Sequence, residues 1–242
     1  MMTAYLFEFI GTALLILLGN GIVANANLKS TYGGTAGWVG ITIGWGMAVF
    51  VGVFVAADVS GAHLNPAVTL ALAAAGKFSW AFVPGYILTQ FLGAMTGTTL
   101  VWLTYKKHYD ATEDQGAILG TFANTPAIKS PFWNFLTEFI ATFAFVLAIF
   151  YIAGGSFSGE QIKLGSLDAL PVALLVLAIG ISLGGPTGYA INPARDLGPR
   201  IMHALLPIKG KGESAWWYAW IPVVGPIAGG LLAAMVYMAI GV

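Results

Sequence analysis

The 242-residue chain contains no cysteine and only 8% charged residues, ten acidic and ten basic. The lack of cysteine excludes disulfides, thiol catalysis and cysteine metal ligands. The balanced charge offers no basic surface for nucleic acid, and a soluble domain of this length would carry far more charge. Hydrophobic residues instead make up 58% of the chain, and the mean hydropathy is +0.83. The composition therefore predicts a protein that crosses a membrane several times.

Six apolar stretches approach the roughly 20 helical residues that a hydrocarbon core of about 30 Å requires. They are Tyr5–Ala24, Trp38–Ala57, Ala81–Leu103, Phe132–Ala153, Leu167–Leu183 and Ala215–Ile240. No basic segment precedes the first stretch, so we expect a span there and not a cleaved signal peptide. Two further segments, "SGAHLNPAVTLALA" at 60–73 and "TGYAINPARDLGPR" at 187–200, each open a helix with Asn-Pro. These helices are too short to cross, and each would cover about half of the core.

The order of these elements repeats along the chain. "EFIGTALLILLG" begins at Glu8 and "EFIATFAFVLAI" begins at Glu138, while Asn-Pro-Ala recurs at Asn65 and Asn192. Each half crosses the membrane three times, so the second copy must be inverted, and broken helices in inverted repeats mark the site of transport proteins. The sequence predicts an all-α membrane protein with six transmembrane helices and two half-helices. It forms one domain over residues 1–242, with repeats of approximately 1–105 and 131–242.

The two Asn-Pro steps have a defined chemistry. Proline is favoured at the first helical position, and asparagine is a preferred N-cap because its side-chain oxygen accepts a backbone N–H of the first turn. The amide groups of Asn65 and Asn192 would remain as donors that point outwards. If both helix starts meet at the bilayer midplane, their positive dipole ends oppose cations and protons. Such a pore favours neutral molecules.

The paired NPA motifs with their flanks, "SGAHLNPAVT" and "NPARDLGP", resemble the aquaporin or major intrinsic protein family over nearly the whole chain. Asp196 and the "IPVVGP" segment are similar to the glycerol facilitator (aquaglyceroporin) branch of that family. The resemblance implies a passive channel for glycerol and similar small uncharged solutes that also conducts water and excludes ions and protons. It further implies a homotetramer with one pore in each chain. The compact loops and the lack of a long tail indicate a bacterial inner membrane, and no cofactor is implied.

The resemblance also assigns residues to the pore. The selectivity filter would comprise Trp45, Gly180, Tyr189 and Arg195. Trp45 and Tyr189 would form an apolar corner for the carbons of a polyol, Arg195 would donate to its hydroxyls, and Gly180 would leave the filter wider than in water channels. Glycerol facilitators usually carry phenylalanine in place of Tyr189. Backbone carbonyls would accept from the solute along the pore, namely those of Gly61, Ala62, His63, Leu64, Gly188, Tyr189, Ala190 and Ile191.

Several other polar residues allow two interpretations. Glu8 and Glu138 lie inside spans, where carboxylates are functional candidates, but the family uses them to hold loop backbone N–H groups. His63 could titrate in the pore or be a fixed side chain, and the second interpretation is favoured. Asp196 is expected to support the outer loop. His108, His203 and the run "YKKHYD" are expected at the surface or in loops. Glycine pairs on two spans, Gly93 with Gly97 and Gly225 with Gly229, predict close helix packing.

Three alternatives to a glycerol channel stay open. A water-selective channel is the nearest, and a transporter coupled to protons through Glu8 or Glu138 is the second. A purely structural membrane protein that aids adhesion is the third. No metal-ligand cluster, phosphate loop or catalytic triad suggests an enzyme. The family orientation places both termini, Lys77 and Lys163 in the cytoplasm, which conflicts with the positive-inside rule because six other lysines then lie outside.

Overall fold

The structure is a computed structural model that describes residues 1–152, 156–157, 160–161 and 167–241. Five of its helices are long and apolar enough to cross a membrane. They are α1 (Met2–Asn27), α2 (Gly37–Ser60), α4 (Val83–Thr104), α7 (Pro131–Ile152) and α10 (Ile221–Ile240). A sixth apolar helix, α8 (Leu170–Leu183), has 14 residues and packs against α2. Two predicted positions, Ala153 at the end of a span and Lys163 in a loop, lie outside the described residues.

Most predicted span ends differ from the helix ends by a few residues, and two predicted starts include turn residues. The last span was expected from Ala215, but residues 216–220 form turns and α10 begins at Ile221. The fifth span was expected from Leu167, whereas α8 begins at Leu170. Proline is the second residue of both helices, where its missing N–H costs no helical hydrogen bond. Hydropathy alone extended both spans across turn residues because tryptophan, alanine and leucine are apolar in turns as well.

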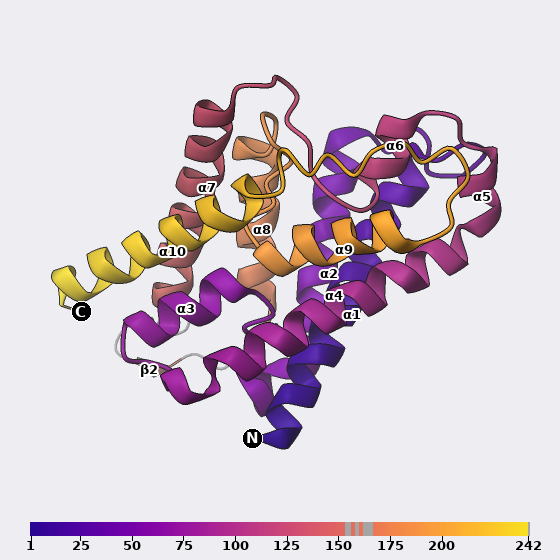
Figure 1. The fold of residues 1–242 in the computed structure, drawn as a ribbon. Coiled ribbons are helices and arrows are strands. Elements are labelled where there is room, and N and C mark those ends of the chain that lie inside the picture. Colours follow the sequence, from indigo (N-terminus) through magenta and orange to yellow (C-terminus); the bar gives the residue numbers. More distant parts are fainter. Residues whose placement is uncertain (153–155, 158–159, 162–166, 242) are drawn as a thin grey trace.

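The two short helices lie in the middle of the molecule. Figure 1 shows α3 (Pro66–Ala74) and α9 (Pro193–Leu205) extending in opposite directions from a central meeting point. Both chain ends lie toward the end of the molecule away from α5 (Lys106–Ala111) and α6 (Gln115–Gly120) (Figure 1). The main apolar core surrounds the place where α3 and α9 meet. The fold is therefore an aquaporin-like helical bundle with two half-helices buried inside it.

The connections contain short elements that hydropathy did not predict. They are η1 (Trp80–Phe82), α5, α6 and the two-residue strands β1 (Ser156–Phe157) and β2 (Glu160–Gln161), which pair antiparallel. A second apolar core, centred on Tyr109 and Phe122, joins α5 and α6 to the ends of α1 and α4. Tyr109, in helix α5, belongs to the "YKKHYD" run that was expected at the surface or in loops. That expectation is wrong for Tyr109, which is fully buried and bonded to Thr121.

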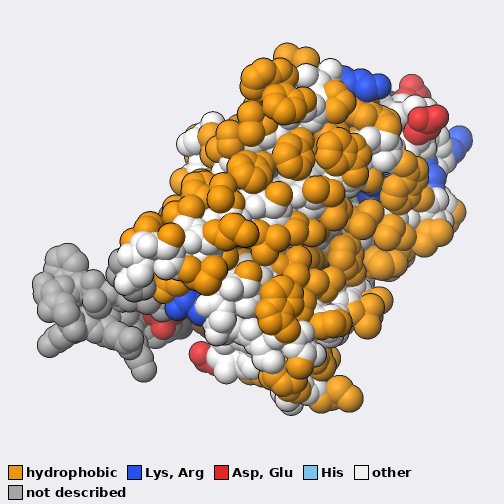
Figure 2. Space-filling model, turned by 60° about the vertical axis from the view of Figure 1, so that its left-hand side comes forward, with side chains coloured by type: hydrophobic (Ala, Val, Ile, Leu, Met, Phe, Trp, Pro, Cys, Tyr) orange, Lys and Arg blue, Asp and Glu red, His pale blue; other side chains and the backbone are white. Residues whose placement is uncertain are grey.

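The outer surface matches a lipid environment. Figure 2 shows apolar side chains across most of the visible face, with Lys, Arg, Asp and Glu gathered mainly toward its two ends. Large apolar side chains such as Leu88, Ile140 and Met235 are about half exposed on the long helices. Contiguous apolar surface of this extent is stable only in lipid or against another apolar surface. The chain is a multi-pass membrane protein.

Glycines allow two pairs of spans to approach closely. A methyl group on Gly93 of α4 would lie 2.5 Å from the carbonyl oxygen of Phe9 on α1. A methyl group on Gly229 of α10 would overlap the carbonyl oxygen of Phe139 on α7. Both neighbours are rigid backbone atoms, so neither helix pair could accept alanine without moving apart.

Substitution of Gly229 by alanine is expected to destabilise the protein by about 1–3 kcal/mol, the usual cost of overpacking. Thermal unfolding in detergent would measure the loss. Gly21→Ala is the matched control, because Gly21 lies on helix α1 with no atom within 4 Å of the added methyl. We expect this control to unfold at the wild-type temperature or slightly above, since alanine favours helix. An equal unfolding temperature for both variants would contradict the packing argument.

Candidate functional site

The two half-helices begin with the same capped turn. Asn65 and Asn192 adopt extended backbone conformations, and each is followed by proline. The Oδ1 atom of Asn65 accepts from the Ala67 N–H at 2.9 Å, and that of Asn192 accepts from Ala194 at 3.0 Å. Each side chain therefore satisfies the first turn of its own helix, as expected of an N-cap.

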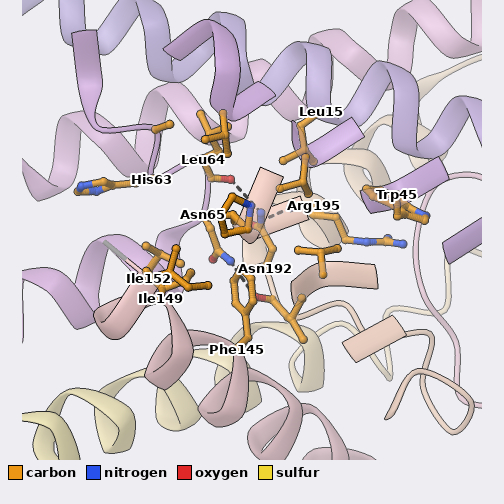
Figure 3. A pocket seen from close by; sticks show the side chains of 18 of the residues that line it. Leu15, Trp45, His63, Leu64, Asn65, Phe145, Ile149, Ile152, Asn192 and Arg195 are labelled. Atoms are coloured by element: carbon orange, nitrogen blue, oxygen red, sulfur yellow. Dashed lines mark hydrogen bonds between the residues drawn. The ribbon is translucent and has the colours of Figure 1, made fainter. Parts of the chain in front are cut away.

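The same two asparagines join the half-helices to each other. The Asn65 Nδ2 donates to the carbonyl of Ile191 at 2.8 Å, and the Asn192 Nδ2 donates to the carbonyl of Leu64 at 2.8 Å. These reciprocal bonds fix the two helix starts side by side, as the close view shows (Figure 3). From the sequence, both N–H groups of each asparagine side chain were expected to remain free as donors. The facing carbonyl uses one of the two, so one donor of each asparagine remains.

Both loops before the half-helices have an unusual backbone. Ala62 and Leu64 in the first loop have φ values of 47° and 50°, and Tyr189 and Ile191 in the second have 41° and 44°. The preceding glycines of both loops also have positive φ. A left-handed conformation costs a residue with a side chain roughly 1–2 kcal/mol. Strain of this kind persists only where surrounding contacts impose it, and it is concentrated at functional sites.

Two buried glutamates hold these loops in place. Glu8 accepts from the backbone N–H groups of His63 at 2.9 Å and Leu64 at 2.8 Å. Glu138 accepts from those of Ala190 and Ile191, both at 3.0 Å. Because the N–H groups of each loop turn toward a carboxylate, the loop backbone is fixed in its left-handed conformation.

Four groups donate hydrogen bonds to the two carboxylate oxygens of Glu8. The side chains of Ser60 and Gln90 donate to its two oxygens at 2.7 and 2.8 Å, in addition to the two backbone N–H groups. An ionised carboxylate can accept at both oxygens, whereas a protonated one would direct an O–H toward another donor. This arrangement suits a fixed side chain that supports the loop backbone.

A cavity of about 480 Å³ runs past the paired asparagines. Its lining includes apolar side chains from α1, α2, α3, α7 and α8, among them Leu15, Val49, Val68, Phe145, Ile149 and Val176. It also includes residues of the two loops, namely Gly61, Ala62, His63, Leu64, Tyr189, Ala190 and Ile191. Figure 3 shows Phe145 and Ile149 on one side of the asparagines and Arg195 extending toward Trp45 on the other. Gly188, expected among the carbonyls, does not line this cavity.

Arg195 and Trp45 meet at one end of this cavity. The guanidinium carbon of Arg195 lies 4.2 Å from the centre of the Trp45 ring, a cation–π arrangement. Both side chains are almost fully buried, at 6% and 4% exposure. The Arg195 Nη1 has no hydrogen-bond partner within the described protein. A buried charged donor without a partner is costly unless a solute or water in the cavity binds it.

Tyr189 and Gly180 lie against each other rather than on opposite walls. A methyl group on Gly180 would lie 2.7 Å from Cζ of the Tyr189 ring. The Tyr189 ring therefore occupies the space that Gly180 leaves, and Gly180 itself does not line the cavity. The Trp38 ring packs edge-on against Tyr189, and its Nε1 donates to the Gly180 carbonyl at 3.0 Å. The lack of a side chain at Gly180 thus makes room for the Tyr189 ring. The width of the predicted filter therefore depends on the position of this ring.

Asp196 and Arg200 form a fully buried ion pair beside the second half-helix. The Arg200 Nε and Nη2 donate to Oδ1 of Asp196 at 2.9 and 2.8 Å, Nη2 also donates to the carbonyl of Asn124, and Nη1 donates to those of Ser214 and Ala215. Asp196 also accepts from the Asn124 backbone N–H at 2.7 Å. Asp196 therefore holds the loop at Asn124 by a hydrogen bond, whereas the central role of Arg200 was not anticipated from the sequence.

The histidines differ in their surroundings. His203, expected at the surface or in a loop, is fully buried within helix α9 and its Nδ1 lies 2.8 Å from the Ser214 hydroxyl, so that expectation is wrong. His108 is partly exposed on α5. The His63 side chain points away from the asparagines (Figure 3), with Nδ1 3.1 Å from the Thr69 hydroxyl and its ring against Phe78. Among the described residues, no three His, Cys, Asp or Glu side chains converge as metal ligands.

Comparisons with known proteins agree with this architecture. The family model described as Major intrinsic protein matches residues 1–237. A "Glycerol uptake facilitator protein" of Streptococcus pneumoniae is 52% identical over 237 residues, which cover 98% of this chain and 99% of that protein. "Glycerol uptake facilitator protein 3" of Lactiplantibacillus plantarum is 51% identical, over 95% and 93% of the two chains. The solved aquaglyceroporin from Plasmodium falciparum superimposes with a TM-score of 0.85 at 33% identity, over 98% of this chain and 95% of that one. The chain belongs to the major intrinsic protein family.

Proposed function

We propose that the protein is a passive membrane channel for glycerol and similar small uncharged solutes, with water as a second permeant. The relatives named as glycerol facilitators support the substrate class. The observation that carries the proposal is the cavity, whose lining combines apolar side chains with the two loops and the polar side chains of Asn65, Asn192 and Arg195. A polyol has a carbon face and a hydroxyl face. It can enter such a cavity with both faces satisfied, so the loss of its hydration is largely offset.

In this proposal different residues contact the carbons and the hydroxyl groups of the solute. Trp45 and Tyr189 contact the carbons of the solute, and Arg195 donates to its hydroxyls through the unpartnered Nη1. Backbone carbonyls of the two loops accept from the solute, since the glutamates already hold the N–H groups of these loops. The remaining amide hydrogens of Asn65 and Asn192 donate to whatever passes the midpoint.

The same groups would exclude cations. Arg195 carries a positive charge, and the starts of α3 and α9 contribute the positive ends of two helix dipoles where the asparagines meet. A proton or metal ion would lose hydration in the cavity and would meet a positive field, which opposes its passage. A neutral solute has no such barrier.

We further propose that residues 1–105 and 131–242 are inverted copies of one unit. Three equivalences support the proposal. Each half contributes a capped half-helix, a buried glutamate that binds two consecutive loop N–H groups, and a glycine that packs on the carbonyl following that glutamate, Phe9 or Phe139. Assembly into a homotetramer follows from the family resemblance and stays a prediction.

Vesicles that contain the purified protein test the glycerol function. After a sucrose step, light scattering should report fast shrinkage, because water leaves through the channel. After a glycerol step, we expect fast shrinkage followed by re-swelling as glycerol enters. Shrinkage without re-swelling would identify a water-selective channel instead. If neither response were faster than in protein-free vesicles, the result would contradict a channel for either solute.

A further inference from the structure

The Trp45 indole lies in a slot that one glycine of α1 creates. A methyl group on Gly19 would overlap Cζ3, Cε3 and Cη2 of the indole, the last at 2.6 Å. Contacts under about 3.0 Å do not occur at real methyl groups, and here the overlap covers three atoms of one rigid ring. Because the ring is rigid, a rotation that moves one of these atoms away from the methyl would not clear the other two. The ring and Gly19 are therefore matched to each other.

The backbone gives no other reason for glycine at this position. Gly19 lies inside α1, and its φ is not among the positive values of the chain. Glycine within a helix costs about 0.5–1 kcal/mol relative to alanine. Its packing against Trp45 accounts for this cost, since any larger residue would displace the ring.

The direction of that displacement follows from the surroundings of Trp45. A methyl group on Gly19 of α1 would meet the six-membered ring at three of its atoms, while the ring itself lines the cavity and has the Arg195 guanidinium over it. The protein is closely packed on the α1 side, and the open space is the cavity. A side chain on residue 19 would therefore push the indole toward Arg195 and narrow the passage between them.

We propose that Gly19 is a positioning residue that sets the width of the solute filter through Trp45, so that glycerol passes as well as water. The proposal rests on the filter assigned under the proposed function. It adds a position that touches neither the solute nor the cavity, and that motif matching did not single out.

The test compares Gly19→Ala with Gly21→Ala in vesicles, with glycerol and water permeabilities measured on the same preparation. Gly21 is the matched control because it lies two residues away on α1 and its added methyl meets nothing within 4 Å. We expect Gly19→Ala to lower the ratio of glycerol to water permeability by about tenfold, which corresponds to about 1.4 kcal/mol in the barrier. Gly21→Ala should leave the ratio unchanged. An unchanged ratio in folded Gly19→Ala would overturn the proposal.

A second pair of variants lacks the indole, so it tests the proposal even if Gly19→Ala alone does not fold. In Trp45→Ala the slot is empty, so the added methyl of Gly19→Ala fits. The ratio of the double variant should equal that of Trp45→Ala alone, as a double-mutant cycle requires when one residue acts only through the other. A further large fall in the double variant would show that residue 19 acts by another route. Wild-type protein that conducts no glycerol would instead refute the proposed function.

Discussion

Replacement of Arg200 by alanine is expected to cause the largest loss of stability, about 3–5 kcal/mol, because it leaves Asp196 as a buried charge without its partner. The guanidinium reaches Asp196 through both Nε and Nη2 and also binds three backbone carbonyls, all in the interior. Its loss would leave the loop at Asn124 joined to Asp196 of the second half-helix only through the Asn124 N–H. We expect little folded protein in detergent and an unfolding temperature far below that of the wild type.

A second ion pair with the same spacing provides the control. Lys106 and Asp110 are also four residues apart, but their side chains are 38% and 35% exposed. Hydrogen bonding from Lys106 lowers the pKa of the Asp110 carboxyl, yet exposed pairs of this kind contribute little to folding because water screens them. Lys106→Ala should unfold at nearly the wild-type temperature. If both variants lost stability equally, burial would not be the cause.

Replacement of Trp45 by alanine is expected to give the largest change in selectivity. The indole lines the cavity and is only 4% exposed, so its removal opens space directly beside Arg195. Four-carbon and five-carbon polyols should then permeate at least about tenfold faster, because a steric barrier of about 1.4 kcal/mol or more is removed. The re-swelling rate of vesicles in a series of polyols measures this effect.

Trp80→Ala serves as the control for this variant. Trp80 lies in η1 at the surface with 57% exposure and does not line the cavity. Its replacement should leave the order of polyol rates unchanged. Unchanged size selectivity in folded Trp45→Ala would remove Trp45 from the filter and, with it, the assignment of the apolar corner.

Much of the helical framework could be predicted from sequence because the signals are strong. Each long span is a continuous apolar run, and an asparagine followed by proline defines the start of each half-helix. The repeated Glu-Phe-Ile placed Glu8 and Glu138 in equivalent positions, and both carboxylates bind loop N–H groups. These features depend on local residue chemistry, which a sequence displays directly.

The parts that were missed depend on contacts between distant segments. Arg200 lies at the end of the second Asn-Pro segment, but its partners Asn124 and Ser214 come from other loops. His203 was expected outside because an isolated histidine gives no sign of burial. The left-handed φ values of Leu64 and Ile191 have no residue signal, since alanine, leucine, tyrosine and isoleucine rarely adopt them. Gly19 likewise resembles any helical glycine until the indole beside it is seen.

The central claim is that solutes cross a fixed open path without coupling to another gradient. Uptake of labelled glycerol into vesicles, measured over a wide range of concentrations with and without a pH difference across the membrane, tests it most directly. A fixed path predicts an uptake rate proportional to glycerol concentration and equal under both conditions. A rate that saturates at low concentration and increases with an inward proton gradient would contradict the channel and favour a transporter that uses Glu8 or Glu138.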